Sequence, residues 1–408
     1  MQIRSIHPFP ARMAPELALA SLGDLEAGST VLDPMAGSGT VLRQALALGH
    51  SAIGFDMDPL AVLMSKVWTT PVSTKHIDKE LRSVLLDSQS LDLRSTSLPW
   101  QRDAETASFI DYWFHSKQRR ELKRIAAVLH ARDKQRLTPE RRAAVDVLRV
   151  ALSRIIVTKE QGASLARDTS HSRPHKVADE SDYDVREGFE RSALQLRKRI
   201  EDHPCAGGAQ VNRGDARALG LEPKSVDAVL TSPPYLNAID YMRGHRLSLV
   251  WLGYSFSELR TIRSTAIGAE RAQDPNTPQK NIKLVTDAMC DFAGMEPRCQ
   301  KMISRYAYDL LQMTAQTAKV LKPGGKATYV VGNSCLKGIF IQNASGVAAA
   351  AKAAGMKKIK ISERDLPMGS RYLPMTDSGS LSKRMRTETI LTFQAPEQSA
   401  VKRTARAK

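Results

Sequence analysis

The sequence predicts an α/β fold in which a doubly wound parallel sheet carries an antiparallel edge strand and a helical insertion. Short apolar runs alternate with helical stretches in the first and last thirds of the chain, and a glycine-rich turn follows the first of these runs. A long polar segment with helical periodicity separates the two parts. Because 42% of the 408 residues are apolar, the chain can form one large domain with an insertion, or two domains.

Charge and composition narrow the classes of protein. The chain has 60 Lys and Arg against 43 Asp and Glu, a net charge of +17, which predicts a polyanion as partner. No apolar stretch approaches the roughly 20 residues of a membrane span, and the N-terminal residues lack a secretory signal. The four cysteines have no metal-ligand spacing. We therefore expect an intracellular protein without a metal site or a membrane association.

The first elements form a strand, loop, helix and strand unit. An apolar run ends at Asp33, a turn holds Gly37 and Gly39, and a helical stretch leads to a second apolar run. This pattern predicts a ligand at the carboxyl ends of parallel strands, where glycine lets the backbone approach it closely. Leu42 occupies the position of the third glycine of the dinucleotide fingerprint, so the loop favours a ligand without a pyrophosphate.

Two acids follow the second apolar run. Asp56 ends the run 17 residues after Gly39, close to the spacing at which an acid binds the hydroxyl pair of a ribose. A solvated or helix-capping aspartate is the alternative. We prefer the capping role for Asp58, because Pro59 and a helical stretch come directly after it.

The middle of the chain, from about residue 71 to 204, predicts basic helices with few strand signals. Residues 101–150 alone hold 12 Lys and Arg against 7 Asp and Glu. Within this helical insertion, a loop over residues 162–176 combines Arg167, His171 and Arg173 with small polar side chains. Such a loop suits contacts with phosphates or base edges, and a solvated loop fits it equally well.

The second half begins with a strand near residue 210, and a buried strand then leads into Thr231-Ser-Pro-Pro-Tyr235. Two successive prolines make an extended backbone without N–H donors, so its carbonyl oxygens are held outward as acceptors. This arrangement suits an amino group that donates hydrogen bonds while its lone pair attacks another atom. Tyr235 offers a flat face for a planar ring. A simple proline turn is the alternative.

The remaining elements complete the sheet. A helix is expected over residues 305–321, then a turn at 322–325, a strand over 326–334 and a helix over 345–355. Two further strands, at 356–364 and 387–395, are expected to pair as the antiparallel edge. The end of the chain shows no periodicity and predicts disorder.

The motifs at 33–40, DPMAGSGT, and at 231–235, TSPPY, together resemble those of the DNA amino-methyltransferases, which use S-adenosylmethionine to methylate exocyclic nitrogens. Met35 departs from the phenylalanine common at that position. The Ser-Pro-Pro-Tyr form is associated with N4 of cytosine, and Asp or Asn forms with N6 of adenine. The resemblance covers residues 1–70 and about 205–395. It implies a Rossmann-like class I methyltransferase sheet, S-adenosylmethionine as cofactor and double-stranded DNA as partner.

The same resemblance implies site residues. Residues 6–15, IHPFPARMAP, are similar to a motif that closes over the methionine end of the cofactor, where Arg12 would pair with the carboxylate. Asp215 matches an acid near the adenine amino group. A surface loop and a surface turn are the respective alternatives. The implied cofactor-binding residues are Arg12, Asp33, Met35, Gly37, Ser38, Gly39, Asp56, Met57 and Asp215, and the implied catalytic residues are Ser232, Pro233, Pro234 and Tyr235.

The implied reaction needs a base that has left the duplex. Hydrogen bonds from its amino group to Ser232 Oγ and a carbonyl near Pro233 would free the nitrogen lone pair, with the ring flipped onto Tyr235. Residues after the catalytic motif also fit a helix with an apolar core face, and late basic residues also fit solvated charge. The DNA-binding candidates are Arg167, His171, Arg173, Asn237, Tyr241, Arg243 and Arg371.

These expectations divide the chain into four parts. Residues 1–70 hold the N-terminal motif and the cofactor-binding half, 71–204 the helical insertion with a DNA-recognition role, 205–395 the catalytic half, and 396–408 a basic disordered tail. The expected activity is N4-cytosine methylation of a specific DNA sequence. The alternatives are an adenine-N6 DNA methyltransferase, a tRNA guanine methyltransferase and an inactive nucleic-acid-binding relative. A cytoplasmic, nucleoid-associated protein of a prokaryote or phage is expected, while a cognate restriction endonuclease and the oligomeric state stay open.

Overall fold

The structure is a computed structural model that describes residues 6–9, 13–94, 96, 98–167, 174–205, 207–236, 240–268, 279–291, 294–366 and 387–397. Statements about structure refer to these residues. The proposed disordered tail lies almost entirely outside them, since the description ends at residue 397. No helix in the described ranges is long and apolar enough to cross a bilayer.

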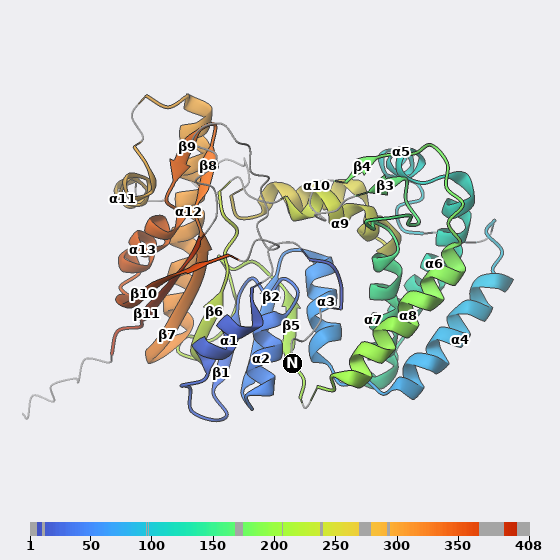
Figure 1. The fold of residues 1–408 in the computed structure, drawn as a ribbon, viewed down its shortest axis with the longest axis horizontal. Coiled ribbons are helices and arrows are strands. Elements are labelled where there is room, and N and C mark those ends of the chain that lie inside the picture. Colours follow the sequence, from blue (N-terminus) through green and yellow to red (C-terminus); the bar gives the residue numbers. More distant parts are fainter. Residues whose placement is uncertain are drawn as a thin grey trace, which may run out of the picture.

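A seven-stranded sheet forms the centre of the fold (Figure 1). β11 runs antiparallel to both of its neighbours, and the other pairs in this sheet are parallel. The predicted α/β class is confirmed. The antiparallel strand, β11, is the second strand of the sheet, and β10 forms the edge. In sheet order the strands are β10 (Lys357–Asp365), β11 (Thr387–Gln394), β7 (Leu321–Gly332), β6 (Val226–Thr231), β1 (Thr30–Asp33), β2 (Ser51–Asp56) and β5 (Gln210–Arg213).

Helices cover both faces of the sheet. Successive residues of β1 point to opposite faces of the sheet. Val31 packs in the same buried cluster as Leu42, and Leu32 packs in a different cluster, with Leu310. Strands buried on both faces are apolar nearly throughout, as in β6. One face carries α1 (Pro15–Leu22), α2 (Thr40–Ala47) and α3 (Pro59–Thr69), and the other carries α11 (Gln279–Met289), α12 (Pro297–Val320) and α13 (Asn343–Ala353).

Residues 71–204 are mainly helical, as their periodicity predicts, and they lie at one end of the molecule beside α3 (Figure 1). These helices are α4 (Thr74–Ser90), α5 (Ala104–Trp113), α6 (Ser116–Lys134), α7 (Pro139–Arg154) and α8 (Val185–Asp202). The segment from α9 to α10 runs between them and the sheet, and comprises α9 (Tyr241–Leu249), η1 (Val250–Leu252) and α10 (Phe256–Thr265). Two short ribbons pair β3 (Ala166–Arg167) with β4 (His175–Lys176), and β8 (Ser334–Leu336) with β9 (Ile339–Ile341).

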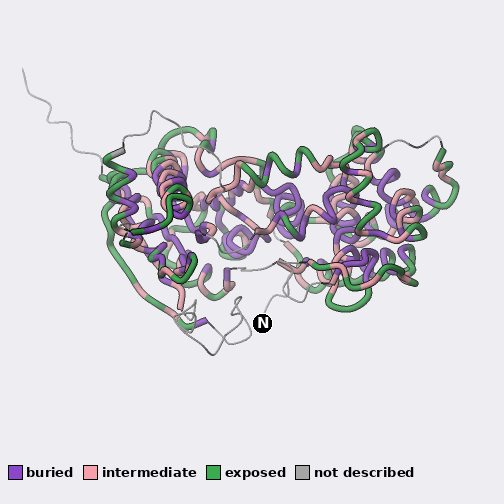
Figure 2. Tube along the Cα trace, turned by 90° about the horizontal axis from the view of Figure 1, so that it is seen from above, coloured by how far each residue is buried: buried purple, intermediate pink, exposed green. Residues whose placement is uncertain are grey.

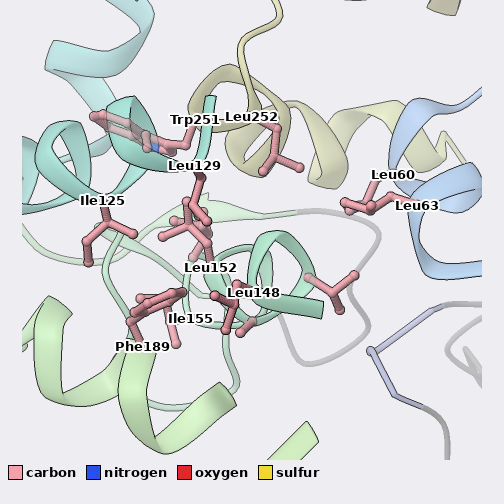
Figure 3. Packing of buried hydrophobic residues seen from close by; sticks show 14 of the residues in the cluster. Leu60, Leu63, Ile125, Leu129, Leu148, Leu152, Ile155, Phe189, Trp251 and Leu252 are labelled. Carbon is pink, nitrogen blue, oxygen red and sulfur yellow. The ribbon is translucent and has the colours of Figure 1, made fainter. Parts of the chain in front are cut away.

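The helical insertion shares its core with the rest of the protein. One buried cluster joins Leu60 and Leu63 of α3 to α6, α7, α8 and η1, and Trp251 and Leu252 of η1 lie within it (Figure 3). Viewed from above, buried segments run through both the sheet part and the helical part (Figure 2). Burial of such a continuous apolar surface ties the helices to α3. The insertion is therefore held in a defined position beside α3.

Candidate active site

The carboxyl ends of the central strands bring the two predicted motifs together. Asp33 ends β1, Asp56 ends β2, and Thr231 ends β6, which pairs with β1. The Thr231 hydroxyl donates to Asp33 Oδ1 at 2.8 Å. This buried bond joins residues 198 positions apart, and it links the glycine-loop motif directly to the proline motif.

The glycine loop is shaped by left-handed backbone at two positions. Gly37 and Gly39 have φ values of 51° and 80°, which residues with a Cβ adopt rarely. A Cβ on Gly39 would also lie 3.0 Å from the backbone of Ser65, whose hydroxyl donates to the Gly37 carbonyl oxygen at 2.9 Å. The Gly37 amide donates to Asp56 Oδ2 at 2.9 Å. The loop is thus held between β2 and α3, with the N-terminus of α2 following it.

Two of the acids at this site have strongly raised pKa values. Burial raises the pKa of Asp33 to about 7, and the nearby Asp56 adds to the shift. Burial raises the pKa of Asp56 to about 6, again with help from a neighbouring carboxylate, that of Asp58. Buried carboxylates beside one another are costly to ionise unless a cation or donors compensate them. A cationic ligand beside these acids would therefore favour their ionised forms and lower both pKa values.

One carboxylate oxygen of Asp33 is the candidate acceptor for such a ligand. Its two hydrogen bonds, from Thr231 Oγ1 and the Met35 amide, both use Oδ1. Among the described residues, none donates to Oδ2. The acids and the glycine loop consequently fit a cofactor with a cationic centre and a hydroxyl-bearing sugar.

Asp58 has the capping role that the sequence predicts. Its side chain accepts the Leu60 amide at the N-terminus of α3 at 2.8 Å. It also forms a buried ion pair with His245 of α9. Burial alone would raise the pKa of Asp58, but His245 outweighs this and lowers it. The pair holds α9, which follows the proline motif, against the cofactor-loop side of the sheet.

The catalytic motif presents acceptors, as its prolines suggest. Ser232 Oγ donates to the Val330 carbonyl oxygen of β7 at 3.0 Å and also interacts with the Tyr235 side chain. The Pro234 carbonyl accepts the buried Tyr306 hydroxyl at 2.8 Å. The Pro233 carbonyl has no donor among the described residues. Among the described residues, Ser232 Oγ, through its second lone pair, and the Pro233 carbonyl are thus available as acceptors.

Tyr235 does not present the open face that the sequence reasoning expects. Its side chain is only 9% exposed, and its hydroxyl lies 3.4 Å from Glu388 of β11. Burial raises the pKa of this phenol well above its usual value. Half-buried Tyr241 stacks instead on Phe9, with ring centroids 5.1 Å apart and planes inclined by 17°. Tyr241 and Phe9 thus form an aromatic pair beside the glycine loop, where Phe9 lies against Gly37.

The other cofactor candidates are distributed around this loop. Ser38 is buried, with its hydroxyl 3.4 Å from that of Thr40. Met35 is half-buried beside the sheet core, and Met57 Sδ lies 3.9 Å from Arg217 Nη2. Asp215 follows β5 and is engaged by Arg217. Arg12 lies outside the described residues.

The DNA-binding candidates are described only in part. Arg167 donates to the carbonyls of Ser164 and Ala166 in its own loop. Arg243 is 45% exposed at the start of α9, 3.9 Å from Asp240. His171, Arg173, Asn237 and Arg371 lie outside the described residues, so their roles stay predictions.

Four residues that make contacts at this site were not predicted from the sequence: Phe9, Arg217, His245 and Tyr306. Phe9 lies within the N-terminal motif at 6–15, which was the one available signal for it. Arg217, His245 and Tyr306 carry no local pattern that separates them from solvated or core residues. Tyr306 contacts Pro234, Arg217 contacts Asp309, and His245 contacts Asp58. In these three pairs the partners lie 72 to 187 positions apart in the sequence.

Comparison with known proteins gives a consistent result at low identity. No family model matches the chain. It is 23% identical over 264 residues to the Type II methyltransferase M.BsoBI of Geobacillus stearothermophilus, which covers 60% of this chain and 51% of that protein. It is 31% identical over 86 residues to the Type II methyltransferase M.MjaII of Methanocaldococcus jannaschii, covering 21% of this chain and 16% of that protein. The chain thus spans at most about half the length of these curated relatives.

Solved structures are more distant. A TehB-like SAM-dependent methyltransferase from Corynebacterium glutamicum aligns with 93% of this chain and 86% of its own, at 8% identity and a TM-score of 0.29. A putative DNA modification methylase from Thermus thermophilus aligns with 46% of this chain and 54% of its own, at 13% identity and a TM-score of 0.22. Such scores carry no argument about function. The sequence similarity is thus to Type II methyltransferases, and the structure brings the motifs at 33–40 and 231–235 together.

Proposed function

We propose that this protein transfers a methyl group from S-adenosylmethionine to the exocyclic N4 of a cytosine that has flipped out of double-stranded DNA. The observation that carries the proposal is the buried bond from Thr231 to Asp33, which joins the ligand loop to the Ser-Pro-Pro-Tyr motif. A cofactor at the loop and an amino group at the motif would therefore be neighbours. The similarity to Type II methyltransferases supports the methyl-transfer part of the proposal.

S-adenosylmethionine supplies a methyl group already activated on a positive sulfonium. The chain's own residues then have to bind and position the reactants. Asp33 and Asp56 provide the negative charge and acceptors of the cofactor site, with the amides after Gly39 at the N-terminus of α2. Ser232 Oγ and the Pro233 carbonyl accept hydrogen bonds from the two N–H groups of the target amine. The nitrogen lone pair is then less delocalised into the ring and can attack the methyl group. No covalent link to the protein is needed, because the amine nitrogen would bond to the methyl carbon as the carbon–sulfur bond breaks, and the methylated amine would then lose one proton to solvent.

The choice of cytosine over adenine rests on the Ser-Pro-Pro-Tyr form of the motif at 232–235, which in the DNA amino-methyltransferases that it resembles is associated with N4 of cytosine. The runner-up is an adenine-N6 DNA methyltransferase, because the scaffold is shared. We also propose that residues 71–204 read the DNA, since they are held next to α9 at the carboxyl end of the sheet.

Methylation of DNA by the purified protein tests the proposal. We expect label from methyl-labelled S-adenosylmethionine to enter duplex DNA of mixed sequence, and nucleoside mass spectrometry to identify N4-methylcytosine. An Asp33→Ala variant, which lacks the carboxylate of the ligand loop, is the inactive control. N6-methyladenine alone would replace the proposed base, and label in RNA but not in DNA would overturn the proposed substrate.

DNA binding is expected to weaken steeply with salt. The net charge of +17 leads us to expect several phosphate contacts, each of which releases a condensed counterion. For about six contacts, the affinity should fall by about 1000-fold between 50 and 200 mM salt. Fluorescence anisotropy with a dye-labelled duplex measures this slope. The same duplex without protein is the control for the effect of salt on the dye. A flat response would contradict an electrostatic grip on DNA.

A further inference from the structure

Arg217, two residues beyond Asp215, has an unusually complete set of partners. Its Nε donates to Asp215 Oδ1 at 2.9 Å and its Nη2 to Asp215 Oδ2 at 2.7 Å, so the guanidinium grips both carboxylate oxygens. The Arg217 amide also donates to Oδ1, at 2.9 Å. Paired bonds of this kind fix the plane of the carboxylate as well as its position.

The other side of the guanidinium is held equally firmly. Arg217 Nη1 donates to Asp309 Oδ1 of α12 at 2.6 Å, and Nη2 donates to the Thr265 carbonyl oxygen at 2.5 Å, at the end of α10. The Asp309 side chain is fully buried and also pairs with Arg305 at 3.3 Å. Burial alone would lower the pKa of Arg217, but Asp215 and Asp309 outweigh it and raise the pKa. Arg217 is therefore a permanent cation locked between two acids.

This grip leaves Asp215 with little freedom to accept other donors. Oδ1 already accepts two N–H groups, whereas Oδ2 accepts the Nη2 bond and shares the Nε proton at 3.1 Å. One lone pair on Oδ2 remains for a ligand, and the Asp215 side chain is 30% exposed. An ionised carboxylate accepts hydrogen bonds but cannot donate them. The open position therefore favours an amino group and repels a carbonyl oxygen.

Asp215 also lies beside the ligand loop. It follows β5, whose Arg213 is paired in register with Asp56 of β2, and the Gly214 amide donates to the Asp56 carbonyl oxygen at 3.0 Å. Asp56 in turn accepts the Gly37 amide of the glycine loop. Asp56 and Asp215 thus lie at the carboxyl ends of adjacent strands, beside the same loop.

We propose that Arg217 is a positioning residue that aims Asp215 at the adenine amino group of the cofactor and so makes the site selective for adenosine over a 6-oxo purine. The inference rests on the proposed function, because it takes an adenosyl cofactor as the ligand. Arginine is required for this task, since the point charge of lysine cannot hold both carboxylate oxygens and the buried Asp309 in one plane. Arg305 keeps Asp309 paired in a lysine variant, so the fold should survive.

Binding of two cofactor analogues tests this role without any turnover. Calorimetry would compare S-adenosylhomocysteine with S-inosylhomocysteine, which has an oxygen in place of the amino group. The wild-type protein should prefer the adenosyl ligand by at least about tenfold, the value of one hydrogen bond. In Arg217→Lys the preference should fall to about twofold or less, through weaker adenosyl binding and unchanged inosyl binding.

Control variants separate this role from a general structural one. Arg197→Lys alters another arginine–aspartate pair, with Asp78 in the helical insertion, and should keep the wild-type preference. An Arg217→Lys protein that loses both ligands equally, or keeps its preference, would overturn the proposal. Should that variant fail to fold by circular dichroism, Asp215→Asn should show the same loss of preference, and retained preference there would overturn it too. Failure of the wild-type protein to bind either analogue would instead count against the proposed function.

Discussion

Replacing Ser232 with alanine is expected to lower the rate of methyl transfer about 100-fold, with cofactor affinity unchanged. Removing one hydrogen-bond partner from a site where charge develops in the transition state typically has an effect of this size. Because Ser232 Oγ donates its proton to the Val330 carbonyl, it acts toward the target amino group as an acceptor. Without this acceptor, the target nitrogen keeps its lone pair in conjugation with the ring.

Single-turnover assays with saturating cofactor measure this effect directly. The affinity for S-adenosylhomocysteine, measured by calorimetry, should match that of the wild-type protein, because Ser232 lies beyond the ligand loop. Ser225→Ala is a matched control, since Ser225 precedes the same strand and its hydroxyl donates to the local Glu222 carbonyl. A Ser232→Ala rate within threefold of wild type would contradict the catalytic assignment.

Replacing Asp33 with asparagine is expected to weaken cofactor binding at least about 100-fold and to stabilise the free protein above pH 7. Asparagine keeps an acceptor oxygen for Thr231 and the Met35 amide, so the loop should retain its shape. It lacks the negative charge that the cationic cofactor needs. Burying the ionised carboxylate destabilises the free wild-type protein. The asparagine variant does not have this cost, so its free energy of unfolding should be higher.

The pH dependence of this effect follows from the raised pKa of Asp33. Burial raises that pKa from 3.8 to about 7, so the folded protein binds a proton that the unfolded chain releases between these values. The stabilising contribution of this proton is complete below about pH 3.8 and is lost as the pH rises through about 7. Asp33→Asn should therefore match the wild type near pH 4 and exceed its stability by on the order of 4 kcal/mol at pH 8.

Asp227→Asn is a control with the opposite sign. Burial alone would raise the pKa of Asp227, but Lys322 and the Thr30 amide outweigh it and lower the pKa. This carboxylate stabilises the fold above its unfolded pKa and loses that contribution as the pH falls, so its removal should destabilise the protein at pH 8. Chemical denaturation between pH 4 and 8 measures both variants. An Asp33→Asn protein less stable than wild type at pH 8 would contradict the raised pKa.

Much of the fold was predictable because its signals are local. The buried strand before Thr231, the glycine loop and the helices of residues 71–204 each follow from the spacing of apolar residues or from glycine and proline. The order of strands at the edge was less accessible. β11 lies between β7 and β10, and this depends on hydrogen bonding between segments far apart in the chain.

The sequence by itself determined the motifs, the acids at the strand ends and the excess of positive charge, because each is a property of neighbouring residues. Only the tertiary structure decided that Tyr235 is buried against Glu388, that His245 binds Asp58, and that Arg217 holds Asp215. Contacts of His245 with Asp58 and of Tyr235 with Glu388 join residues more than 150 positions apart. No periodicity encodes such pairs, because they form only when the helices dock on the sheet and bury those side chains together.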